Sequence, residues 1–502
     1  MVEKILFWLD AGFTQFGIAK SLQKIIDGKY FAIIDTNKGR QFFKNQKFVN
    51  FEKIWFYRDC FDENKKIDME FLINFEKRYG INLWKIIYSD VHFNKYNKFH
   101  KFSLENILLI IEQEIRLFEK VIEQIKPDFL IIRTTDYAKN QILHQICKMK
   151  KISILSLGHT RLGKKCVITE ENDLLDNHQK ITESIVSSNY DWKKLQMQFQ
   201  LYSTSQKKYI KTYQVSKLKK IQAFWNFFIL IFNSKYRKYY EHKGWNIINL
   251  LKNELSNFFK QKIRKRFINK NSIKDIKFHE KYVYFPLQFE PERTILISAP
   301  FYTNQLELIK NIARSIPIDY FLYVKEHPAQ IVHNWRKIEY YKEILRLPNV
   351  RLIDTSISST TLIKNSNLVA TVTGTVGLEA AALQKPSIVF GDSIYSELSC
   401  VHRIKNISIL PEIIRLSLKK KLNPNEIQKF IDMLDNISFE FDISEMTLEI
   451  DHIFHFDSFL QDVKIDTKKM SIFLNDNKEN FLTLANEHKK NIMIYKNLKK
   501  NN

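Results

Sequence analysis

The stretch 368–391, LVATVTGTVGLEAAALQKPSIVFG, contains the pattern that decides the fold. An apolar run at 368–372 is followed by a Thr- and Gly-rich turn, a short Ala-rich segment and a second apolar run at 387–390. Short apolar runs bounded by turn residues are typical of buried strands. The stretch therefore predicts two parallel strands joined by a helix.

The same alternation extends outward on both sides of this stretch. In the second half of the chain we expect strands at 282–287, 294–298, 320–324 and 350–353, and helices at 305–315 and about 334–345. In the first half we expect strands at 4–9, 30–34, 128–132 and 152–157, and helices at 15–26 and 104–125. Strands that alternate with helices predict an α/β fold class with two doubly wound, Rossmann-like domains.

The chain of 502 residues is long enough for two or three domains. Shifts in composition divide it into four parts. We expect a Rossmann-like domain at 1–200, a basic amphipathic helical insert at 205–280, a second Rossmann-like domain at 281–418, and a helical C-terminal region at 419–502.

The positive charge is concentrated in the expected insert. The chain has 79 Lys and Arg against 55 Asp and Glu, a formal net charge of +24. Between 207 and 281 there are 20 Lys and Arg residues and four acidic residues, which is a net charge of +16. The basic character is therefore mostly local, and a nucleic-acid partner is not expected, because no RNA-recognition or zinc-finger signature accompanies it.

An aromatic and aliphatic run, IQAFWNFFILIF at 221–232, lies inside this basic segment. As a helix it would span roughly 18 Å, too little to cross a bilayer. Basic flanks around an apolar face suit a helix that lies in an anionic headgroup region. The alternative is two ordinary core helices with solvated Lys side chains. The residues expected to contact the inner leaflet are Lys219, Lys220, Trp225, Phe227, Phe228, Arg237 and Lys238.

Other features favour a cytoplasmic protein without a metal framework. The four cysteines lie far apart with no CxxC pair, so neither a zinc site nor a disulfide scaffold is expected. Glu3 and Asp10 interrupt the first apolar run, which is typical of a strand rather than a signal peptide. No uninterrupted apolar run is long enough to predict a spanning helix.

Polar residues follow the expected strands of the second half. Turns rich in Ser, Thr and Gly offer backbone N–H groups to a phosphate, and these turns contain Ser358, Ser359, Thr373, Gly374 and Thr375. Gly377 lets a ligand approach the backbone, Glu379 can accept hydrogen bonds from ribose, and His327, fixed by Pro328, can donate to a departing phosphate. The structural alternatives are an N-cap for Ser359, a favourable first-turn acid for Glu379 and a plain turn for His-Pro.

Strand ends of the first half present a second group of polar residues. Because ligands of doubly wound sheets bind beyond the carboxyl ends of the strands, these residues are expected at a cleft: Asp10, Gly12, Arg133, Asp136, His159 and Arg161. Asp10 and Asp136 can instead cap helices, and His159 can be a structural histidine.

The order of the motifs resembles a known family. FPLQFEPE, YVKEHP, the Ser pair and TVTGTVGLEAAALQKPSIVFG succeed one another over 281–396, and KPDFLIIRTTD with ISILSLGHTRLG stands in the first half. This set resembles the capsule and surface polysaccharide biosynthesis glycosyltransferases, which include Kdo transferases. It is similar more distantly to bacterial polysialyltransferases.

The resemblance implies a metal-independent, cofactor-free GT-B glycosyltransferase, with two domains facing across a cleft. It uses a nucleotide-activated sugar, CMP-linked in the best-known relatives, and a glycan or lipid-linked glycan acceptor bound by the first domain. It implies that His327 assists departure of the nucleotide and that Ser358 and Ser359 hold the donor phosphate with Lys325 nearby. It also implies that Glu292 lies at the domain edge, as a candidate catalytic residue in contact with the donor or the acceptor. The base of the polysialyltransferases belongs to an acidic pair before Gly. This chain has a single acid there, Asp10, which we expect to deprotonate the acceptor hydroxyl.

Three alternatives remain at this point. A nucleotide-sugar 2-epimerase shares the fold and a His-Pro turn, but needs no acceptor. A teichoic-acid-type polyol-phosphate transferase also combines these features with membrane attachment, yet its Thr-Asp-Tyr-Ser-Ser loop is replaced here by Thr-Gly-Thr. The third is a non-catalytic basic binding or scaffold protein. For the leading interpretation we expect a cytoplasmic enzyme peripherally attached to the inner face of the cell membrane.

Overall fold

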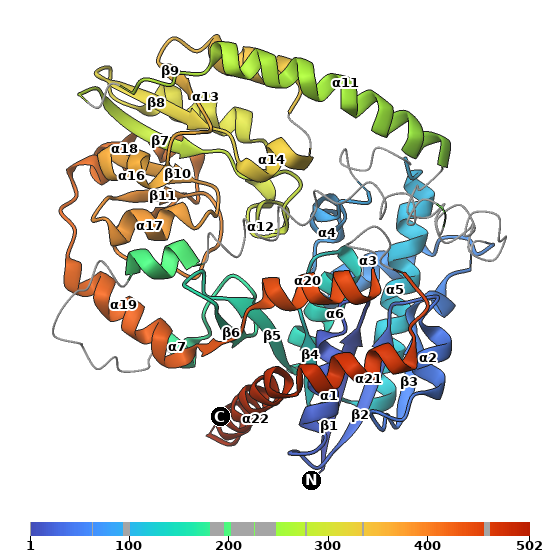
Figure 1. Cartoon of the computed structure of the whole chain (residues 1–502). Coiled ribbons are helices and arrows are strands. Elements are labelled where there is room, and N and C mark those ends of the chain that lie inside the picture. Colours follow the sequence, from blue (N-terminus) through green and yellow to red (C-terminus); the bar gives the residue numbers. More distant parts are fainter. Residues whose placement is uncertain are drawn as a thin grey trace. The chain divides into compact units, whose positions relative to one another are not determined.

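The computed structural model describes residues 2–62, 64–93, 101–180, 195–201, 225, 247–276, 279–333, 336–455 and 462–501. The chain divides into two compact units, each with its own sheet (Figure 1). Unit 1 comprises 1–176, 201–244 and 437–502, and unit 2 comprises 177–200 and 245–436. The last part of the chain thus belongs to the N-terminal unit, whereas the sequence pattern divided the chain into consecutive blocks.

The sheet of unit 1 has seven strands in the order β13-β6-β5-β4-β1-β2-β3. The strands from β3 to β5 in this order run parallel, while β6 pairs antiparallel with both β5 and β13. Their bounds are β1 Glu3–Leu9, β2 Gly28–Ile34, β3 Lys53–Phe56, β4 Phe129–Ile132, β5 Ser153–His159, β6 Lys165–Thr169 and β13 Phe439–Glu440.

Helices cover both faces of this sheet (Figure 1). One face packs on a core that includes apolar side chains of α3, α4, α5 and α6, and on the other α1 packs against the C-terminal helix α22. The helices of this unit are α1 Thr14–Leu22, α2 Arg40–Asn45, α3 Met69–Tyr79, α4 Leu83–Ser89, α5 Leu104–Ile125, α6 Ala138–Met149, α20 Ile443–Phe454, α21 Thr467–Asp476 and α22 Lys478–Asn501.

Helix α5 shows how local sequence sets these elements. It begins after Ser103, whose Oγ accepts the backbone N–H of Asn106 over 3.1 Å. Ile111, Ile115 and Phe118 recur on one face and are fully buried in the core against the sheet.

The sheet of unit 2 has six parallel strands in the order β12-β11-β10-β7-β8-β9. Counted from its own first strand this is the 3-2-1-4-5-6 order of the Rossmann fold. The bounds are β7 Lys281–Pro286, β8 Tyr320–Lys325, β9 Val350–Ile353, β10 Leu368–Thr371, β11 Ser387–Val389 and β12 Val401–Arg403.

Unit 2 has a core on each side of its sheet. Helices α13 and α18 pack with one core, and α16 and α17 with the other. The helices are α7 Asn177–Lys180, α11 Ile247–Asn271, α12 Arg293–Leu296, α13 Gln305–Ser315, α14 Pro328–His333, α15 Ile338–Leu345, α16 Ser359–Asn365, α17 Val376–Ala382, α18 Leu410–Lys419 and α19 Pro424–Ile437.

The expected fold class is confirmed, since the chain contains two doubly wound, Rossmann-like units. The helices at 104–125 and 305–315 and the strand at 350–353 have the expected bounds. The strand expected at 294–298 is wrong, because 293–296 form the short helix α12, in which the N–H groups of Ile295 and Leu296 bond to the carbonyl of Glu292. A short apolar run is compatible with either structure.

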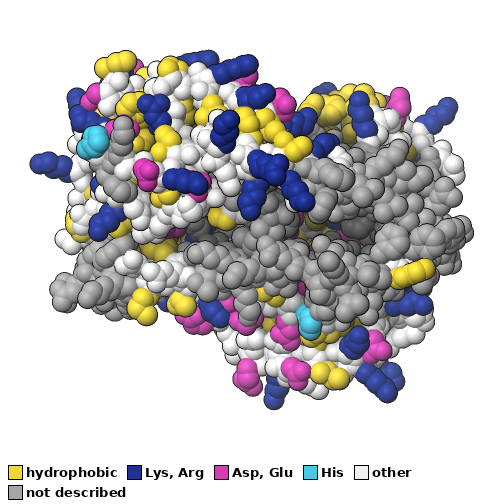
Figure 2. All heavy atoms as spheres, turned by 45° about the horizontal axis from the view of Figure 1, so that its top comes forward, with side chains coloured by type: hydrophobic (Ala, Val, Ile, Leu, Met, Phe, Trp, Pro, Cys, Tyr) yellow, Lys and Arg dark blue, Asp and Glu magenta, His cyan; other side chains and the backbone are white. Residues whose placement is uncertain are grey.

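The basic segment lies largely outside the described residues. Of the expected membrane contacts only Trp225 is described, and its side chain is exposed; the other six fall at 202–224 and 226–246. None of the described helices is both long and apolar enough to cross a bilayer. On the face drawn in Figure 2, Lys and Arg side chains of the described residues lie interspersed with hydrophobic and acidic ones.

Candidate active site

The His-Pro turn of unit 2 follows the carboxyl end of β8. His327 is the residue before α14 and Pro328 is the first residue of that helix, a position that proline favours. Nδ1 of His327 accepts the backbone N–H of Ala329 over 3.1 Å, so the ring caps the helix. In the neutral ring the proton therefore resides on Nε2, which makes Nε2–H a hydrogen-bond donor.

The His327 ring is neutral at physiological pH. Burial, together with the positive charges of Arg336 and Lys325, lowers its pKa to about 4. A neutral imidazole can donate a hydrogen bond to a phosphate oxygen without carrying a charge. A phosphate placed beside it would favour the protonated ring and raise this pKa, because opposite charges stabilise each other.

Lys325 joins the end of β8 to the beginning of α16. The residue is buried, and its Nζ donates to the Oγ of Ser359 over 3.1 Å and to the carbonyl of Ile357. Ser359 also accepts a long hydrogen bond of 3.4 Å from the hydroxyl of Tyr284. Ser358 precedes α16 and its side chain is exposed. The structure thus brings Lys325 and Ser359 together, as the motif order predicts for two successive strand ends.

A buried ion pair fixes the backbone of the turn. The Glu326 carboxylate accepts from Arg336 over 2.8 and 3.0 Å, from the Tyr341 hydroxyl over 2.5 Å and from the backbone N–H of His327 over 2.7 Å. Burial raises the pKa of Glu326, and the Arg336 charge opposes this shift. Because a buried charge is costly unless it is paired, this cluster holds the turn in one conformation.

The same cluster reaches the loops after β7 and β10. Arg336 donates to the carbonyl of Gln288 over 2.6 Å, and the Gln288 side chain accepts the backbone N–H of Thr373 over 2.7 Å. Gln305 closes the arrangement by bonding to the backbone N–H and carbonyl of Gln288 over 2.8 and 3.0 Å. Strands β7 and β10 are neighbours from which the chain continues in opposite directions, the place where doubly wound sheets bind ligands.

Gly374 in the loop after β10 and Gly377 in the first turn of α17 have a packing role that the sequence did not reveal. A Cβ on Gly377 would lie 2.6 Å from the Tyr395 hydroxyl, and one on Gly374 would lie 2.7 Å from Oγ1 of Thr371. The Tyr395 hydroxyl also donates to the Gly374 carbonyl. Close packing against Tyr395 therefore requires Gly377 whether or not a ligand is present.

Glu379 lies on α17, which begins after Thr375. Among the described residues no hydrogen bond or ion pair engages its carboxyl group, and burial raises its pKa to about 7. Glu292 precedes α12. Its neighbour Glu290 enters the network instead, accepting from Gln305 over 2.7 Å and pairing with Arg336 at 3.4 Å.

At the strand ends of unit 1, Asp10 lies beside Gly12 and Arg133. Oδ1 of Asp10 accepts the backbone N–H of Gly12 over 2.8 Å. Burial raises the pKa of Asp10, while the Gly12 hydrogen bond and the Arg133 charge oppose the shift. Arg133 donates to Thr447 of α20 over 3.0 Å. The second carboxylate near Asp10 is Asp35, which follows the adjacent strand β2 and acts on the Asp10 pKa.

The other expected residues of this unit are His159, Arg161 and Asp136. Burial and the Arg133 charge lower the pKa of His159 to about 4. Arg161 is buried and pairs with Asp173 at 3.7 Å. Asp136 is exposed and accepts from Thr134 over 2.6 Å. The described residues contain no group of three or more His, Cys, Asp or Glu side chains placed to hold a metal ion.

Together these features define a protein with two Rossmann-like units and polar residues at the strand ends of each. Residues 164–399, just under half of the chain, match the family model described as capsule polysaccharide biosynthesis protein. This match confirms the resemblance that the motifs indicated, and it supports a glycosyltransferase of capsule polysaccharide synthesis.

Among solved structures the chain is similar to UDP-GlcNAc 2-epimerase from Methanocaldococcus jannaschii, with 14% identity, a TM-score of 0.23, and coverage of 87% of this chain and 100% of that chain. It is also similar to the β-Kdo 2,7-transferase of KpsC from Thermosulfurimonas dismutans, with 13% identity, a TM-score of 0.30, and coverage of 66% and 87%. For the β-Kdo 2,4-transferase of that protein the values are 13%, 0.28, 61% and 79%. No curated protein matches the chain.

Proposed function

We propose that the protein is a glycosyltransferase that transfers a sugar from a nucleotide-activated donor to a surface polysaccharide or lipid-linked glycan. Unit 2 binds the donor and unit 1 binds the acceptor. The family match over 164–399 supports the class of reaction. The observation that carries the assignment of the donor site is the His327 turn, which presents a neutral Nε2–H donor beside a buried lysine.

The donor phosphate is stabilised at the strand ends of β8 and β9. His327 donates a hydrogen bond to the phosphate oxygen on which negative charge develops as the sugar departs. Lys325 adds positive charge, and Ser358 and Ser359 contact the phosphate from the start of α16. The unengaged carboxyl group of Glu379 accepts hydrogen bonds from ribose hydroxyls. These groups and the helix N-termini perform the charge stabilisation that a metal ion provides in other transferases.

Asp10 activates the acceptor in this mechanism. Its carboxylate takes the proton of an acceptor hydroxyl while the hydroxyl oxygen bonds to the anomeric carbon and the bond from that carbon to the phosphate oxygen breaks. Burial raises the pKa of Asp10. A raised pKa makes a carboxylate a better proton acceptor. Gly12 holds one oxygen of Asp10 through its N–H group, which orients the other.

In this proposal the basic segment attaches the enzyme to the membrane. With its aromatic run and the charges around it, the segment 205–280 attaches the protein to an anionic membrane surface where a lipid-linked acceptor is presented.

A ligand screen followed by a transfer assay tests the proposal. Purified protein is heated with CMP-, UDP-, GDP- and CDP-sugars, and we expect one nucleotide class to raise the melting temperature, because a ligand that binds only the folded state stabilises it. Transfer is then measured with and without a glycan acceptor, in the presence of EDTA. Conversion of the donor without acceptor would instead indicate an epimerase. Salt-sensitive binding of duplex DNA with no response to any nucleotide sugar would refute the proposal.

A further inference from the structure

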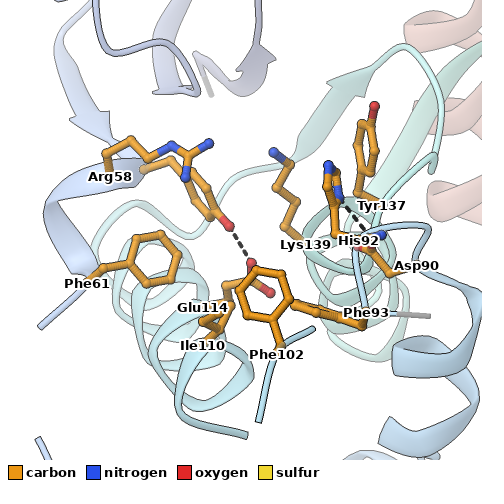
Figure 3. Close-up of a pocket in the computed structure, with 11 residues that line it drawn as sticks. Arg58, Phe61, Asp90, His92, Phe93, Phe102, Ile110, Glu114, Tyr137 and Lys139 are labelled. Atoms are coloured by element: carbon orange, nitrogen blue, oxygen red, sulfur yellow. Dashed lines mark hydrogen bonds and ion pairs between the residues drawn. The ribbon is translucent and has the colours of Figure 1, made fainter. Parts of the chain in front are cut away.

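Unit 1 contains a pocket that is lined by none of the expected site residues (Figure 3). It lies between α5 and the loops after β3, α4 and β4, and encloses about 560 Å³ of space that includes its opening to solvent. Aromatic and charged side chains line it, and the charged ones include Glu114, Arg58 and Lys139. Concave sites with apolar walls and a few convergent polar groups are typical of small-ligand sites.

Glu114 of α5 has one carboxyl oxygen that is available for a hydrogen bond to a ligand. It is 3% exposed, and its Oε1 accepts the hydroxyl hydrogen of Tyr57 (Figure 3). Within the described part of the chain its Oε2 has no hydrogen-bond partner. Burial raises the pKa of Glu114 to about 8, so the group is mostly protonated at neutral pH. Since Oε1 accepts from Tyr57, the proton resides on Oε2, which is then a buried donor without an acceptor.

Aromatic rings form the walls beside this donor. Tyr57 and Phe61 meet edge to face with ring centroids 5.1 Å apart, and Phe93 and Phe102 do so at 5.4 Å. Phe61 and Phe93 are only partly buried, so part of their surface remains open to a ligand. Flat apolar faces next to a hydrogen-bond donor complement a pyranose ring, which has apolar C–H faces and a rim of oxygen atoms.

Charged residues also line the pocket, and one of them, Lys139, acts on the pKa of Asp10. Lys139 pairs with Asp35 and lies 5.0 Å from the Tyr57 ring centroid, and Arg58 pairs with the same carboxylate at 3.4 Å. The charges of Asp35 and Lys139 act on the pKa of Asp10, and the Asp35 N–H bonds to the carbonyl of Leu9 over 2.8 Å. The pocket and Asp10 therefore share one edge of the unit 1 sheet.

We propose that this pocket binds one pyranose ring of the acceptor, with Glu114 donating a hydrogen bond to a sugar oxygen and the Phe61 and Phe93 rings packing against the sugar. This inference rests on the proposed function, because it assigns to the acceptor a subsite beside the base. The proposal adds Glu114, Phe61 and Phe93 to the acceptor site, which the sequence had limited to residues at the ends of strands.

Saturation-transfer NMR on the full-length protein tests the pocket without any donor. The probes are methyl β-D-glucopyranoside, methyl β-D-galactopyranoside and methyl β-D-glucuronide, with glycerol as a polyol control. We expect transfer to the ring protons of at least one pyranoside and none to glycerol. Glu114→Leu removes the donor, and Phe93→Ala removes a wall; each should weaken binding about tenfold, since the sugar loses a buried hydrogen bond or an aromatic contact.

Two matched variants complete the design. Glu114→Gln keeps a donor and an acceptor at this position, and Tyr88→Ala removes an exposed ring of the same unit that lies outside the pocket. Both should bind within about twofold of the wild type. If Glu114→Leu fails to fold, as its melting curve would show, the partly exposed Phe93 decides the matter.

The pocket assignment is overturned if the wild type gives no transfer to any pyranoside, or if Phe93→Ala and Glu114→Leu bind as the wild type does. That result is distinct from failure of the proposed function, which shows itself as no thermal response to nucleotide sugars and no transfer. A donor response without pyranoside binding would refute the pocket and leave the transferase standing.

Discussion

The ammonium group of Lys325 donates a hydrogen bond to the Oγ of Ser359 over 3.1 Å, and so connects the end of β8 with the start of α16. In the proposed function both residues contact the donor phosphate. The contact positions a buried cation at one edge of the sheet, where it also lowers the pKa of His327.

Replacement of this lysine should weaken donor binding. We expect Lys325→Met to raise the donor KM by about tenfold or more. The variant removes a positive charge that the fold already holds in position for the donor phosphate. Ser359→Ala should have a smaller effect, and the double variant should fall short of the sum, since the two side chains contact each other. The exposed Lys364→Met on the same helix is the control. Equal effects of Lys325→Met and Lys364→Met would contradict the assignment.

Two substitutions of His327 separate its structural role from its chemical role. Asn can keep the acceptor for the Ala329 N–H that Nδ1 provides, but it lacks the Nε2–H donor. We expect both His327→Ala and His327→Asn to lower kcat by about 100-fold or more. Only the Ala variant should lose about 1 kcal/mol of unfolding free energy with its cap. Chemical denaturation and initial rates measure the two effects; wild-type turnover in the Asn variant would refute the role of the donor.

The buried pair Glu326–Arg336 should be costly to break from one side. We expect Arg336→Met to lower the free energy of unfolding by about 3–5 kcal/mol, because it leaves an uncompensated buried carboxylate. Adding Glu326→Gln should restore part of this loss, since the Gln oxygen still accepts from the His327 N–H and its NH2 group can donate to the Tyr341 hydroxyl oxygen, without a buried charge. Urea denaturation of the three proteins provides the comparison. A double variant less stable than Arg336→Met would show that the charge is not the cause.

Glu114 predicts a pH dependence of stability. Its pKa is raised from 4.5 to about 8 by burial, so the folded state binds the proton more tightly than the unfolded state. This stabilisation is fully present below about pH 4.5 and is lost as pH rises through about 8. Glu114→Gln mimics the protonated acid and should lose less stability between pH 5 and pH 8.5 than the wild type does, by on the order of a few kcal/mol. Parallel pH profiles of the two proteins would contradict this.

Membrane attachment can be tested on the basic segment directly. Charge reversal at Lys219, Lys220, Arg237 and Lys238 should abolish sedimentation with vesicles that contain anionic lipid, because each basic residue near such a surface contributes about 1 kcal/mol. Neutral vesicles and high salt should give the same loss with the wild type. Unchanged sedimentation of the charge-reversed protein, or of a folded variant lacking 217–266, would refute the idea.

The grouping of polar residues at the proposed donor site could largely be predicted from the sequence because these residues follow strands. Lys325 and His327 stand directly after an apolar run, and Ser359 follows the next one, so the parallel sheet brings them to one edge. The buried partners were missed for a physical reason. Arg336 and Gln288 bond to each other across 48 positions of the chain. No local pattern distinguishes a buried arginine from one on the surface.

At the proposed acceptor site, too, the sequence indicated some residues and missed others. Asp10 was found because it ends the first strand, whereas Asp35 and Lys139 were not singled out, since their pairing depends on the order β4-β1-β2 of the strands. Glu112, Gln113 and Glu114 form a polar run within α5 that reads as a solvated face, yet all three are buried.

By itself the sequence determined the two α/β units, the strand ends that carry polar residues and the place of the excess charge, because these depend on local composition and periodicity. The tertiary structure alone decided which polar side chains are buried together. Burial and pairing set the pKa of Glu114, the proton position on His327 and the partner of Glu326, and they arise only when strands distant in the chain become neighbours.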